Sequence, residues 1–328
     1  MVRTARTRRP APDVRTSPPE PEPTRDKAPA EKFRFRVRRF AAASRYAELL
    51  GDRIRVAHLT DMHVGLVTPM KVQREAIAIV NRERPDLVVL TGDFVCHTHA
   101  WLDDLTEVLA ALQVPAFAVL GNHDYWAGAQ GVRHALKRAN VELLSNQNTV
   151  LRVRGQRLQI VGLDDAYTGH ADRRKALRGI DPHVATLGLS HIAEEADAMW
   201  EGGVPFVLSG HTHAGQLTLA RLHELTIGRL AGHRYVHGLY GQRRDKGAVY
   251  VNAGVGAAVM PLRFGDRGNR EVAFFELGAR PGDLDHDEHH DEQVPLRPAS
   301  DEPHDLAQAR AHARFQARRK KLFRPPKT

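Results

Sequence analysis

Short apolar runs alternate with helical patterns between residues 54 and 252, and this alternation is the strongest constraint on the fold. Each run is five to seven residues long and ends in polar or turn-forming residues, which is typical of buried strands. The runs cover residues 54–60, 87–91, 116–120, 158–163, 184–190, 205–209 and 248–252. Apolar residues at helical spacing within 71–84 and 101–112 predict helices between the first three runs. Strands that alternate with helices predict an α/β fold built of packed layers.

Composition divides the chain into three parts. Residues 1–50 contain 13 Lys and Arg against 6 Asp and Glu, and seven prolines lie within the first 30 residues, which predicts a basic, Pro/Arg-rich arm that is largely disordered. Within this arm, the mixture of Arg and Phe in 32–50 favours a strand and helix packed on the core over a basic surface for anionic lipid. We predict one folded domain over residues 51–278. Residues 279–328 are acidic and then basic, and they are predicted to form a charged, mostly disordered tail.

The net charge of +9 lies mainly in the arm, because residues 51–278 hold 25 basic residues against 24 acidic ones. A nucleic-acid-binding domain is expected to carry its charge on the fold itself, so nucleic acid is not the expected partner. The single cysteine, Cys96, cannot form an internal disulfide, and no apolar run approaches the roughly 20 residues of a membrane span. We therefore expect a cytoplasmic protein, with any contact with the inner face of the membrane made peripherally through the basic arm.

Asp, Asn and His residues follow five of the predicted strands at the point where each strand ends. They are Asp61 and His63 after the first run, Asp93 after the second, Asn122, His123 and Asp124 after the third, His191 after the fifth, and His211 and His213 after the sixth. Ligands of open α/β folds bind beyond the carboxyl ends of the strands. These side chains are therefore expected to converge although they lie far apart in the sequence.

Oxygen and nitrogen donors without a thiolate suit Mn²⁺, Fe, Zn²⁺ or Mg²⁺ and disfavour soft metal sites. Seven of these residues are candidate ligands, which is more than one ion usually needs. Two ions roughly 3.5–4 Å apart that share one carboxylate would use them all. Taken singly, each motif also fits a turn or a helix cap. Their occurrence together, each at a strand end, favours a site for two divalent metal ions.

The full set of motifs resembles the calcineurin-like metallophosphoesterases, over roughly residues 52–278. The motifs are Asp61-x-His63, Gly92-Asp93, Gly121-Asn122-His123-Asp124, His191 and Gly210-His211-Thr212-His213. The resemblance implies a four-layer α/β/β/α sandwich with two ions at the strand ends, Mn²⁺ being expected first and Fe, Zn²⁺ or Mg²⁺ being the alternatives. It implies that Asp61, His63, Asp93 and His213 bind one ion, that Asp93, Asn122, His191 and His211 bind the other, and that Asp93 bridges them.

The same resemblance implies that the chain is a metal-dependent phosphoric ester hydrolase. The attacking group would be a hydroxide that bridges the two ions, because two cations lower the pKa of water between them. His123 would act as general acid or electrostatic stabiliser, with Asp124 orienting it. A turn or cap residue is the alternative role for Asp124.

Residues 210–216, 250–256 and 261–265 resemble a bacterial subgroup of YkuE-type phosphodiesterases and UDP-2,3-diacylglucosamine pyrophosphatases. The segment 92–97 and Asp124 depart from the Gly-Asp-x-Val-Asp-Arg-Gly and Gly-Asn-His-Glu motifs of the protein Ser/Thr phosphatases, which disfavours that branch. The expected substrate is a phosphodiester or pyrophosphate, either a small molecule or linked to a lipid. Two alternatives stay open: a cyclic-nucleotide phosphodiesterase, and a non-catalytic protein that binds membrane or nucleic acid through the basic arm.

Overall fold

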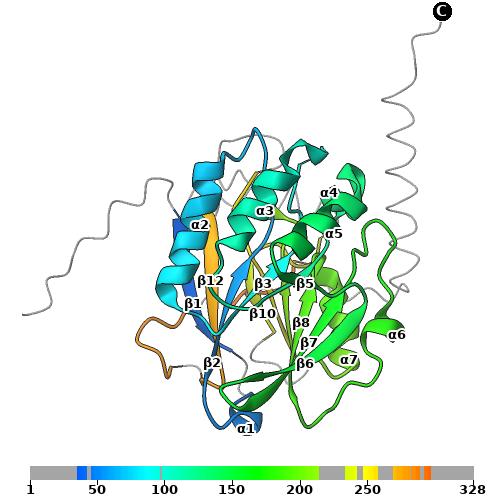
Figure 1. Cartoon of the computed structure of the whole chain (residues 1–328). Helices are drawn as coiled ribbons and strands as arrows, with labels where there is room; N and C mark the ends of the chain where they lie inside the picture. Colours follow the sequence, from blue (N-terminus) through cyan, green and yellow to red (C-terminus); the bar gives the residue numbers. More distant parts are fainter. Residues whose placement is uncertain are drawn as a thin grey trace, which may run out of the picture. The chain divides into compact units, whose positions relative to one another are not determined.

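The computed structural model describes residues 35–42, 46–96, 98–213, 233–241, 247–257, 269–280, 282–288 and 292–296 (Figure 1). All of these residues belong to one of the two compact units of the chain, Phe33–Thr328. The other unit, Met1–Lys32, lies outside the described residues, and so do the predicted arm up to residue 34 and the predicted tail from residue 297.

Two six-stranded sheets form the centre of the described unit (Figure 1). The first sheet comprises β1 (Phe35–Ala41), β2 (Ile54–Leu59), β3 (Leu87–Thr91), β4 (Ala116–Val119), β5 (Val141–Leu143) and β12 (Arg270–Leu277), in the order β1-β12-β2-β3-β4-β5. The second comprises β6 (Gln147–Val153), β7 (Gln156–Leu163), β8 (Ala185–Ser190), β9 (Phe206–Ser209), β10 (Gly238–Tyr240) and β11 (Ala248–Val251), in the order β10-β11-β9-β8-β7-β6. Strands β2, β3 and β4 are parallel to one another, as are β8 and β9, so each set directs its carboxyl ends to one edge of its sheet.

The inner faces of the two sheets pack on each other, and helices cover the outer faces, except that Tyr46 of the first helix is buried between the sheets. The helices are α1 (Tyr46–Leu49), α2 (Met70–Glu83), α3 (Leu102–Ala110), α4 (Asn122–Ala127), α5 (Ala129–Arg138), α6 (Arg173–Ala176) and α7 (Ala196–Glu201), with short 3₁₀ turns at His99–Trp101 and Ala193–Glu195. Val89 of β3 lies in the inter-sheet core together with Leu187 of β8. Its neighbours Val88 and Leu90 pack instead with α2, α3 and α5, because successive side chains of a strand point to opposite faces.

The helices of the second sheet complete the layers. Met199 of α7 and Ala176 of α6 share a core with Val161 and Val207 on the outer face of that sheet. The architecture is therefore α/β/β/α, which confirms the predicted fold class. Helix α2 forms where the apolar spacing predicts it, with a buried stripe that contains Val72.

Strand β1 and helix α1 lie within the segment 1–50 that is predicted to be an arm. Strand β1 pairs in parallel with β12 along its whole length, from Phe35 opposite Arg270 to Ala41 opposite Glu276. Phe40 is fully buried in the inter-sheet core. This part of the predicted arm is therefore packed on the core, and the folded unit begins before residue 51.

Residues 282–288 and 292–296 lie against the fold, although the sequence predicts a mostly disordered tail from residue 279. The backbone N–H of Glu288 donates to the carbonyl oxygen of Arg39 at 3.0 Å. The Glu288 carboxylate accepts hydrogen bonds from Arg36 and Arg38, each at 2.9 Å. Part of the predicted tail therefore belongs to the folded unit, because its acidic side chain Glu288 pairs with basic side chains of β1.

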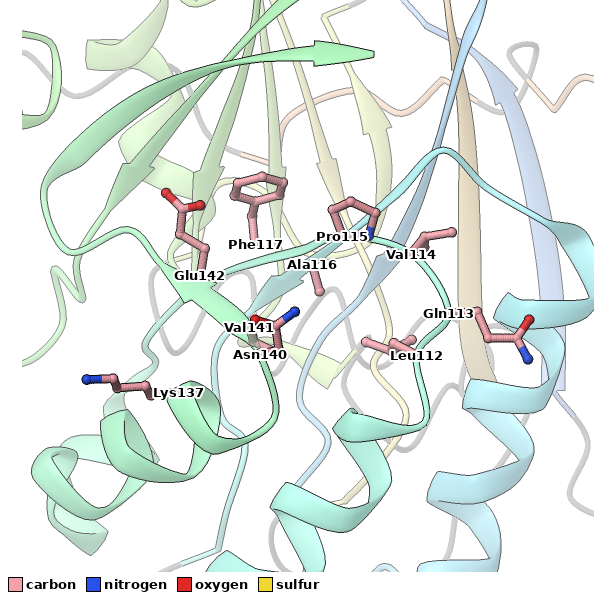
Figure 2. Close-up of a pocket in the computed structure, with 10 residues that line it drawn as sticks. All are labelled: Leu112, Gln113, Val114, Pro115, Ala116, Phe117, Lys137, Asn140, Val141 and Glu142. Carbon is pink, nitrogen blue, oxygen red and sulfur yellow. The ribbon is translucent and has the colours of Figure 1, made fainter. Parts of the chain in front are cut away.

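A pocket of about 530 Å³ opens at the amino-terminal ends of β4 and β5 (Figure 2). Its charged lining residues are Lys137 and Glu142. The predicted metal ligands follow the carboxyl ends of the strands, so this pocket lies at the opposite edge of the first sheet from them. Among the described ranges, no helix combines the length and the apolar character needed to cross a membrane.

Candidate metal centre

The predicted site residues all follow the carboxyl ends of strands in the two sheets. Asp61 and His63 follow β2, Asp93 follows β3, Asn122, His123 and Asp124 open α4 after β4, His191 follows β8, and His211 and His213 follow β9. Each of the seven predicted metal ligands has a polar side-chain atom no more than 3.4 Å from that of another. The structure therefore brings the whole predicted set together.

Asp61, His63, Asp93 and His213 form a first donor group, in which one ligand atom of each lies within 4.8 Å of the others. The Nε2 atoms of His63 and His213 are 2.9 Å apart. Oδ1 of Asp61 lies 3.2 Å from Nε2 of His213, and Oδ2 of Asp93 lies 3.6 Å from Nε2 of His63. Imidazole nitrogens and carboxylate oxygens from three loops thus point into one small buried volume.

Asp93, His191 and His211 form a second donor group, and Asn122 adjoins it. Nε2 of His191 lies 3.4 Å from Oδ2 of Asp93, 3.2 Å from Oδ1 of Asn122 and 3.3 Å from Nδ1 of His211. Asp93 therefore belongs to both groups, and the same oxygen faces a histidine in each.

Five residues of the two donor groups have left-handed backbone conformations. The φ angles are 50° at Asp61, 45° at His63, 54° at Asp93, 75° at His211 and 51° at His213. A residue other than glycine is uncommon in this region, and holding it there costs on the order of 1–3 kcal/mol. Such strain persists where the surroundings fix the backbone, and it is concentrated at functional sites.

Threonines at the strand ends orient two of the ligands. The Thr60 hydroxyl and the His211 backbone N–H both donate to Oδ2 of Asp61, at 2.8 and 3.0 Å. Nδ1 of His191 donates to the carbonyl oxygen of Thr91 at 2.7 Å, which directs Nε2 toward Asp93. Sequence reasoning did not single out these threonines. The available signal is the Thr60 hydroxyl directly before Asp61, whereas the Thr91 contact uses a backbone carbonyl that any residue supplies.

The motif glycines allow the ligand loops to approach one another. Gly92 has a φ of 90°, and a Cβ atom there would lie 2.6 Å from the backbone nitrogen of Gly121 and 2.8 Å from Nδ1 of His191. A Cβ atom at Gly121 would lie 2.6 Å from the backbone nitrogen of Asp93. Any side chain at these two positions would therefore displace the shared carboxylate or His191.

The residues fit a divalent cation. Oδ1 of Asp61 is buried and has no hydrogen-bond partner among the described residues, while it faces the ring nitrogens of His63 and His213. A buried carboxylate oxygen without a donor is costly, and a cation between these groups removes that cost. Carboxylate, amide and imidazole donors together suit Mn²⁺, Fe, Zn²⁺ or Mg²⁺.

Similarity to known proteins identifies the family. Residues 54–215 match the family described as Calcineurin-like phosphoesterase. Phosphodiesterase YaeI of Escherichia coli is 30% identical over 231 residues, which cover 68% of this chain and 82% of that protein. The chain belongs to the calcineurin-like phosphoesterase family.

Two further bacterial relatives agree with this assignment. An uncharacterized metallophosphoesterase of Aquifex aeolicus is 32% identical over 232 residues, covering 65% of this chain and 81% of that protein. The uncharacterized metallophosphoesterase YkuE of Bacillus subtilis is 27% identical over 219 residues, covering 65% and 76%. This calcineurin-like phosphoesterase is therefore a metal-dependent phosphoric ester hydrolase, as the motifs predict.

The contacts of Asp124 differ from the predicted role of orienting His123. Its Oδ2 accepts the backbone N–H groups of Gly121 and Asp93 at 2.9 and 3.0 Å, and its Oδ1 accepts those of Phe94 and Val95 at 2.8 and 3.3 Å. Within the described part of the chain these four N–H groups are its hydrogen-bond partners, and His123 is not among them. Asp124 therefore fixes the loop that carries Asp93 and caps α4, which is the alternative role that the sequence left open.

His123 lies at the edge of the first donor group. Its backbone N–H donates to Oδ1 of Asp93 at 2.9 Å. Its ring meets that of His63 edge to face, with 4.8 Å between centroids, and lies 4.7 Å from the ring of Trp126. The side chain is half-buried. His123 thus stands next to the ligands with part of its surface open.

Burial and neighbouring charges shift the pKa values of the site residues. Burial opposes the charged forms of Asp93 and His191, but their mutual attraction outweighs burial, so the pKa of His191 rises to about 10 and that of Asp93 falls well below its usual value. Burial raises the pKa of Asp61 to about 7, against the opposing charge of His191. Burial and the charge of His191 lower the pKa of His211. Protons and metal ions therefore compete for this site.

Two aromatic rings border the site on the side of His123 and His211. Trp126 lies 6.1 Å from Tyr167, and Tyr167 lies 5.5 Å from His211, between ring centroids. Both aromatic side chains are half-buried, and neither belongs to the hydrophobic clusters of the described core. Both rings therefore pack against residues of the site.

Proposed function

We propose that this chain hydrolyses a phosphodiester or pyrophosphate bond with two divalent metal ions held at the strand ends. The observation that carries the proposal is the position of Asp93. Its Oδ2 lies 3.6 Å from Nε2 of His63 and 3.4 Å from Nε2 of His191. One carboxylate therefore belongs to two donor groups, which is the arrangement that two adjacent ions require.

Seven residues would hold the ions. The first ion would be bound by Asp61, His63, Asp93 and His213, and the second by Asp93, Asn122, His191 and His211. We propose Mn²⁺ for both positions, with Fe, Zn²⁺ or Mg²⁺ as alternatives, because the donors are oxygen and nitrogen. When bound, the ions lower the pKa of water and offset charge on the phosphoryl oxygens.

His123 is the proposed proton donor to the leaving oxygen. It stands beside the first donor group without belonging to it, and its backbone is tied to Oδ1 of Asp93 at 2.9 Å. Trp126 packs against its ring, which restricts the rotation of the imidazole and excludes water from that side. A histidine placed next to the reacting phosphoryl group can protonate the leaving oxygen or stabilise its charge. Asp124 would act on His123 only indirectly, by fixing the Asp93 loop.

The proposed substrate is a phosphodiester, in line with the name of the Escherichia coli relative, a phosphodiesterase. A pyrophosphate linked to a lipid is the second candidate, and it would use peripheral membrane contact through residues 1–34. Arg36 and Arg38 are paired with Glu288, so they are poor candidates for binding lipid headgroups. A cyclic nucleotide is the third candidate, because it presents the same diester bond.

Hydrolysis of bis-p-nitrophenyl phosphate tests the proposed function. Metal-stripped protein should be inactive and should regain turnover with Mn²⁺, faster on this diester than on p-nitrophenyl phosphate. Asp93→Asn should lower kcat/KM by more than about a hundredfold. Loss of a residue that only supports a metal ligand typically costs about 10–100-fold, so a larger loss indicates that Asp93 is itself a ligand. Asp103→Asn, at a side chain that is 86% exposed, is the matched control and should leave turnover unchanged.

A substrate panel then separates the candidates. A linear diester, a nucleotide-sugar diphosphate and a cyclic nucleotide each present one of the proposed bonds. Absence of turnover on all of them with Mn²⁺, Fe²⁺, Zn²⁺ and Mg²⁺ would contradict the proposal.

A further inference from the structure

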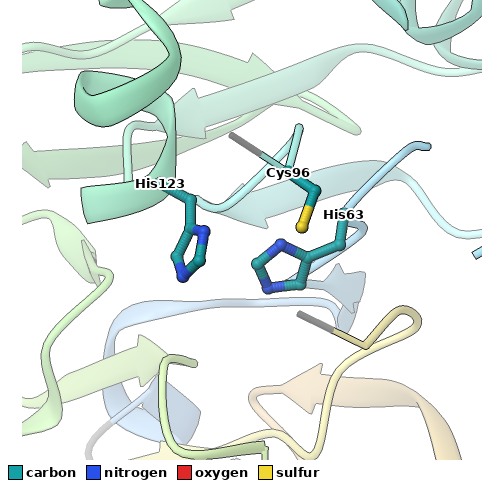
Figure 3. A group of neighbouring side chains, drawn as sticks. All are labelled: His63, Cys96 and His123. Carbon is teal, nitrogen blue, oxygen red and sulfur yellow. The ribbon is translucent and has the colours of Figure 1, made fainter. Parts of the chain in front are cut away.

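Cys96 lies beside His63 and His123, at the border of the proposed metal centre (Figure 3). One ligand atom from each of these three residues lies within 4.8 Å of the other two. The sulfur of Cys96 points toward the ring of His63, and the ring of His123 stands next to both (Figure 3). Cys96 and His123 are half-buried, so part of this cluster is exposed.

Backbone hydrogen bonds fix the position of the cysteine. Phe94 and Val95, the two residues before it, donate their N–H groups to Oδ1 of Asp124 at 2.8 and 3.3 Å. Val64, which follows His63, donates its N–H to the carbonyl oxygen of Phe94 at 2.8 Å. The carboxylate that holds the Asp93 loop thus also holds the thiol next to His63.

The two ring nitrogens of His63 serve different neighbours. Its Nε2 lies 2.9 Å from Nε2 of His213 and 3.6 Å from Oδ2 of Asp93, inside the first donor group. The other ring nitrogen faces the sulfur of Cys96 (Figure 3). The Cys96 side of the imidazole is therefore separate from the side that would face the first ion.

We propose that Cys96, His123 and His63 form a third cation site that selects thiophilic divalent cations such as Zn²⁺. One thiolate and two imidazoles are a donor set that Zn²⁺ favours, whereas Mn²⁺ and Mg²⁺ favour oxygen. Zinc bonds of about 2.3 Å to sulfur and about 2.1 Å to nitrogen place tetrahedral ligands roughly 3.6 Å apart, so side-chain shifts of about 1 Å close this site. Two protons pass to solvent when the cation binds, that of the Cys96 thiol and that on Nδ1 of His63, because Nε2 of His63 is committed to the first ion. Water fills the fourth position.

A cation at this site would withdraw His123 from the substrate, a consequence that rests on the proposed function. Zn²⁺ would then inhibit an enzyme already loaded with Mn²⁺, whereas additional Mn²⁺ would not. Inhibition would be reversible, because only three protein ligands hold the cation and Cys96 and His123 are partly exposed.

Binding is tested on the Mn²⁺-loaded full chain with Cd²⁺ as the probe, because a cadmium–thiolate bond absorbs in the ultraviolet. The chain contains a single cysteine, so any such band reports on Cys96. We expect a band that saturates at one Cd²⁺ per chain, is absent in Cys96→Ser, and requires at least about tenfold more Cd²⁺ in His123→Gln. A band with the same Cd²⁺ dependence in His123→Gln would mean that the thiol binds alone, which would overturn the three-residue site.

Inhibition provides the second arm. The Zn²⁺ concentration for half-inhibition of diester hydrolysis should rise at least about tenfold in Cys96→Ser, while turnover in Mn²⁺ alone stays unchanged. Equal inhibition of the variant and the unchanged chain would overturn the regulatory role. If no diester is hydrolysed at all, the proposed function fails, and the Cd²⁺ titration still decides whether the third site exists.

Discussion

At the residue scale, the same side chains that would bind metal also strain the metal-free fold. His213 has a φ of 51°, a backbone conformation that is costly for residues other than glycine. Oδ1 of Asp61 is buried without a hydrogen-bond donor among the described residues. A bound cation offsets these costs, because it attracts the donor atoms that surround it. A substitution that relieves these costs is therefore expected to weaken the binding of metal.

His213→Asn tests this opposition. Asparagine tolerates the left-handed region better than histidine, which offsets the loss of the hydrogen bond between Nε2 of His213 and Nε2 of His63. The stability of the metal-free protein should change by less than about 1 kcal/mol, while the rise in Tm on addition of Mn²⁺ should shrink. Thermal unfolding with a chelator and with Mn²⁺ measures both. A lower Tm without metal, together with an unchanged response to Mn²⁺, would contradict the account.

Asp124→Asn tests the role of the loop contacts. The amide offers one oxygen where the carboxylate accepts four N–H groups, and its NH₂ group then faces donors. Buried unsatisfied donors cost about 1–3 kcal/mol each, so we expect a loss of at least about 2 kcal/mol in urea unfolding. Affinity for Mn²⁺ should fall by about 10–100-fold.

The pH profile of the same variant separates the two roles of Asp124. Asp124 holds the Asp93 loop rather than His123, so the pH dependence of turnover at saturating Mn²⁺ should keep its shape. An altered profile with unchanged affinity for Mn²⁺ would instead support the predicted contact with His123.

At the scale of elements, the sequence predicts a strand or helix well where its own residues carry the pattern, and poorly where its burial depends on distant segments. Apolar runs gave β2, β3, β4, β7, β8, β9 and β11 nearly residue for residue, because a strand buried on both faces is apolar throughout. The ligands at the strand ends were predictable for the same reason. Strand β1 was left ambiguous because its burial depends on β12 and Glu288, which lie more than 200 residues away in the sequence. The role of Asp124 was left open between orienting His123 and capping a helix, because it depends on contacts between loops, and the position of Cys96 beside His63 depends on such contacts too.

Glu288→Gln tests the attachment of the C-terminal segment to β1. Arg38 has a side chain that is 3% exposed, and Glu288 is its ion-pair partner at 2.9 Å. Removing Glu288 takes away the ion-pair partner of the buried Arg38 charge, which keeps the attraction of Glu271, and we expect a loss of about 2–3 kcal/mol in urea unfolding. Mn²⁺-dependent turnover of the folded protein should not change, because β1 lies at the outer edge of its sheet.

Glu107→Gln is the matched control for this variant. Glu107 pairs with Arg74 on the surface, where both side chains are more than half exposed, so its removal should cost about 0–1 kcal/mol. Equal losses in the two variants would show that the C-terminal segment does not stabilise β1.

At the scale of the whole molecule, stability is linked to the competition between protons and metal ions. The pKa of Asp61 is raised to about 7 by burial, and that of His191 is raised to about 10 by Asp93, whose attraction exceeds the effect of burial. A group whose pKa is raised on folding stabilises the fold below its ordinary pKa and loses this contribution as the pH passes its folded pKa. Asp61 therefore loses its contribution to stability between about pH 4 and 7, and His191 loses its contribution between about pH 6.5 and 10.

The Tm of the metal-free protein should therefore fall between about pH 6 and pH 9. Metal ligands must be deprotonated to bind, so the rise in Tm caused by Mn²⁺ should grow over the same range. Thermal unfolding with and without a chelator at several pH values measures this difference. A Mn²⁺ effect that is constant or shrinks with rising pH would contradict the proposed competition.

The number of Mn²⁺ ions needed for turnover is the most direct test of a pair of ions that share Asp93. Metal-stripped protein is titrated with Mn²⁺ while bound metal per chain and hydrolysis of bis-p-nitrophenyl phosphate are followed together. We predict full turnover only at two ions per chain, one retained ion in His191→Ala, and loss of tight binding at both positions in Asp93→Asn. Full turnover at one ion per chain, or two tightly bound ions in Asp93→Asn, would contradict the shared carboxylate.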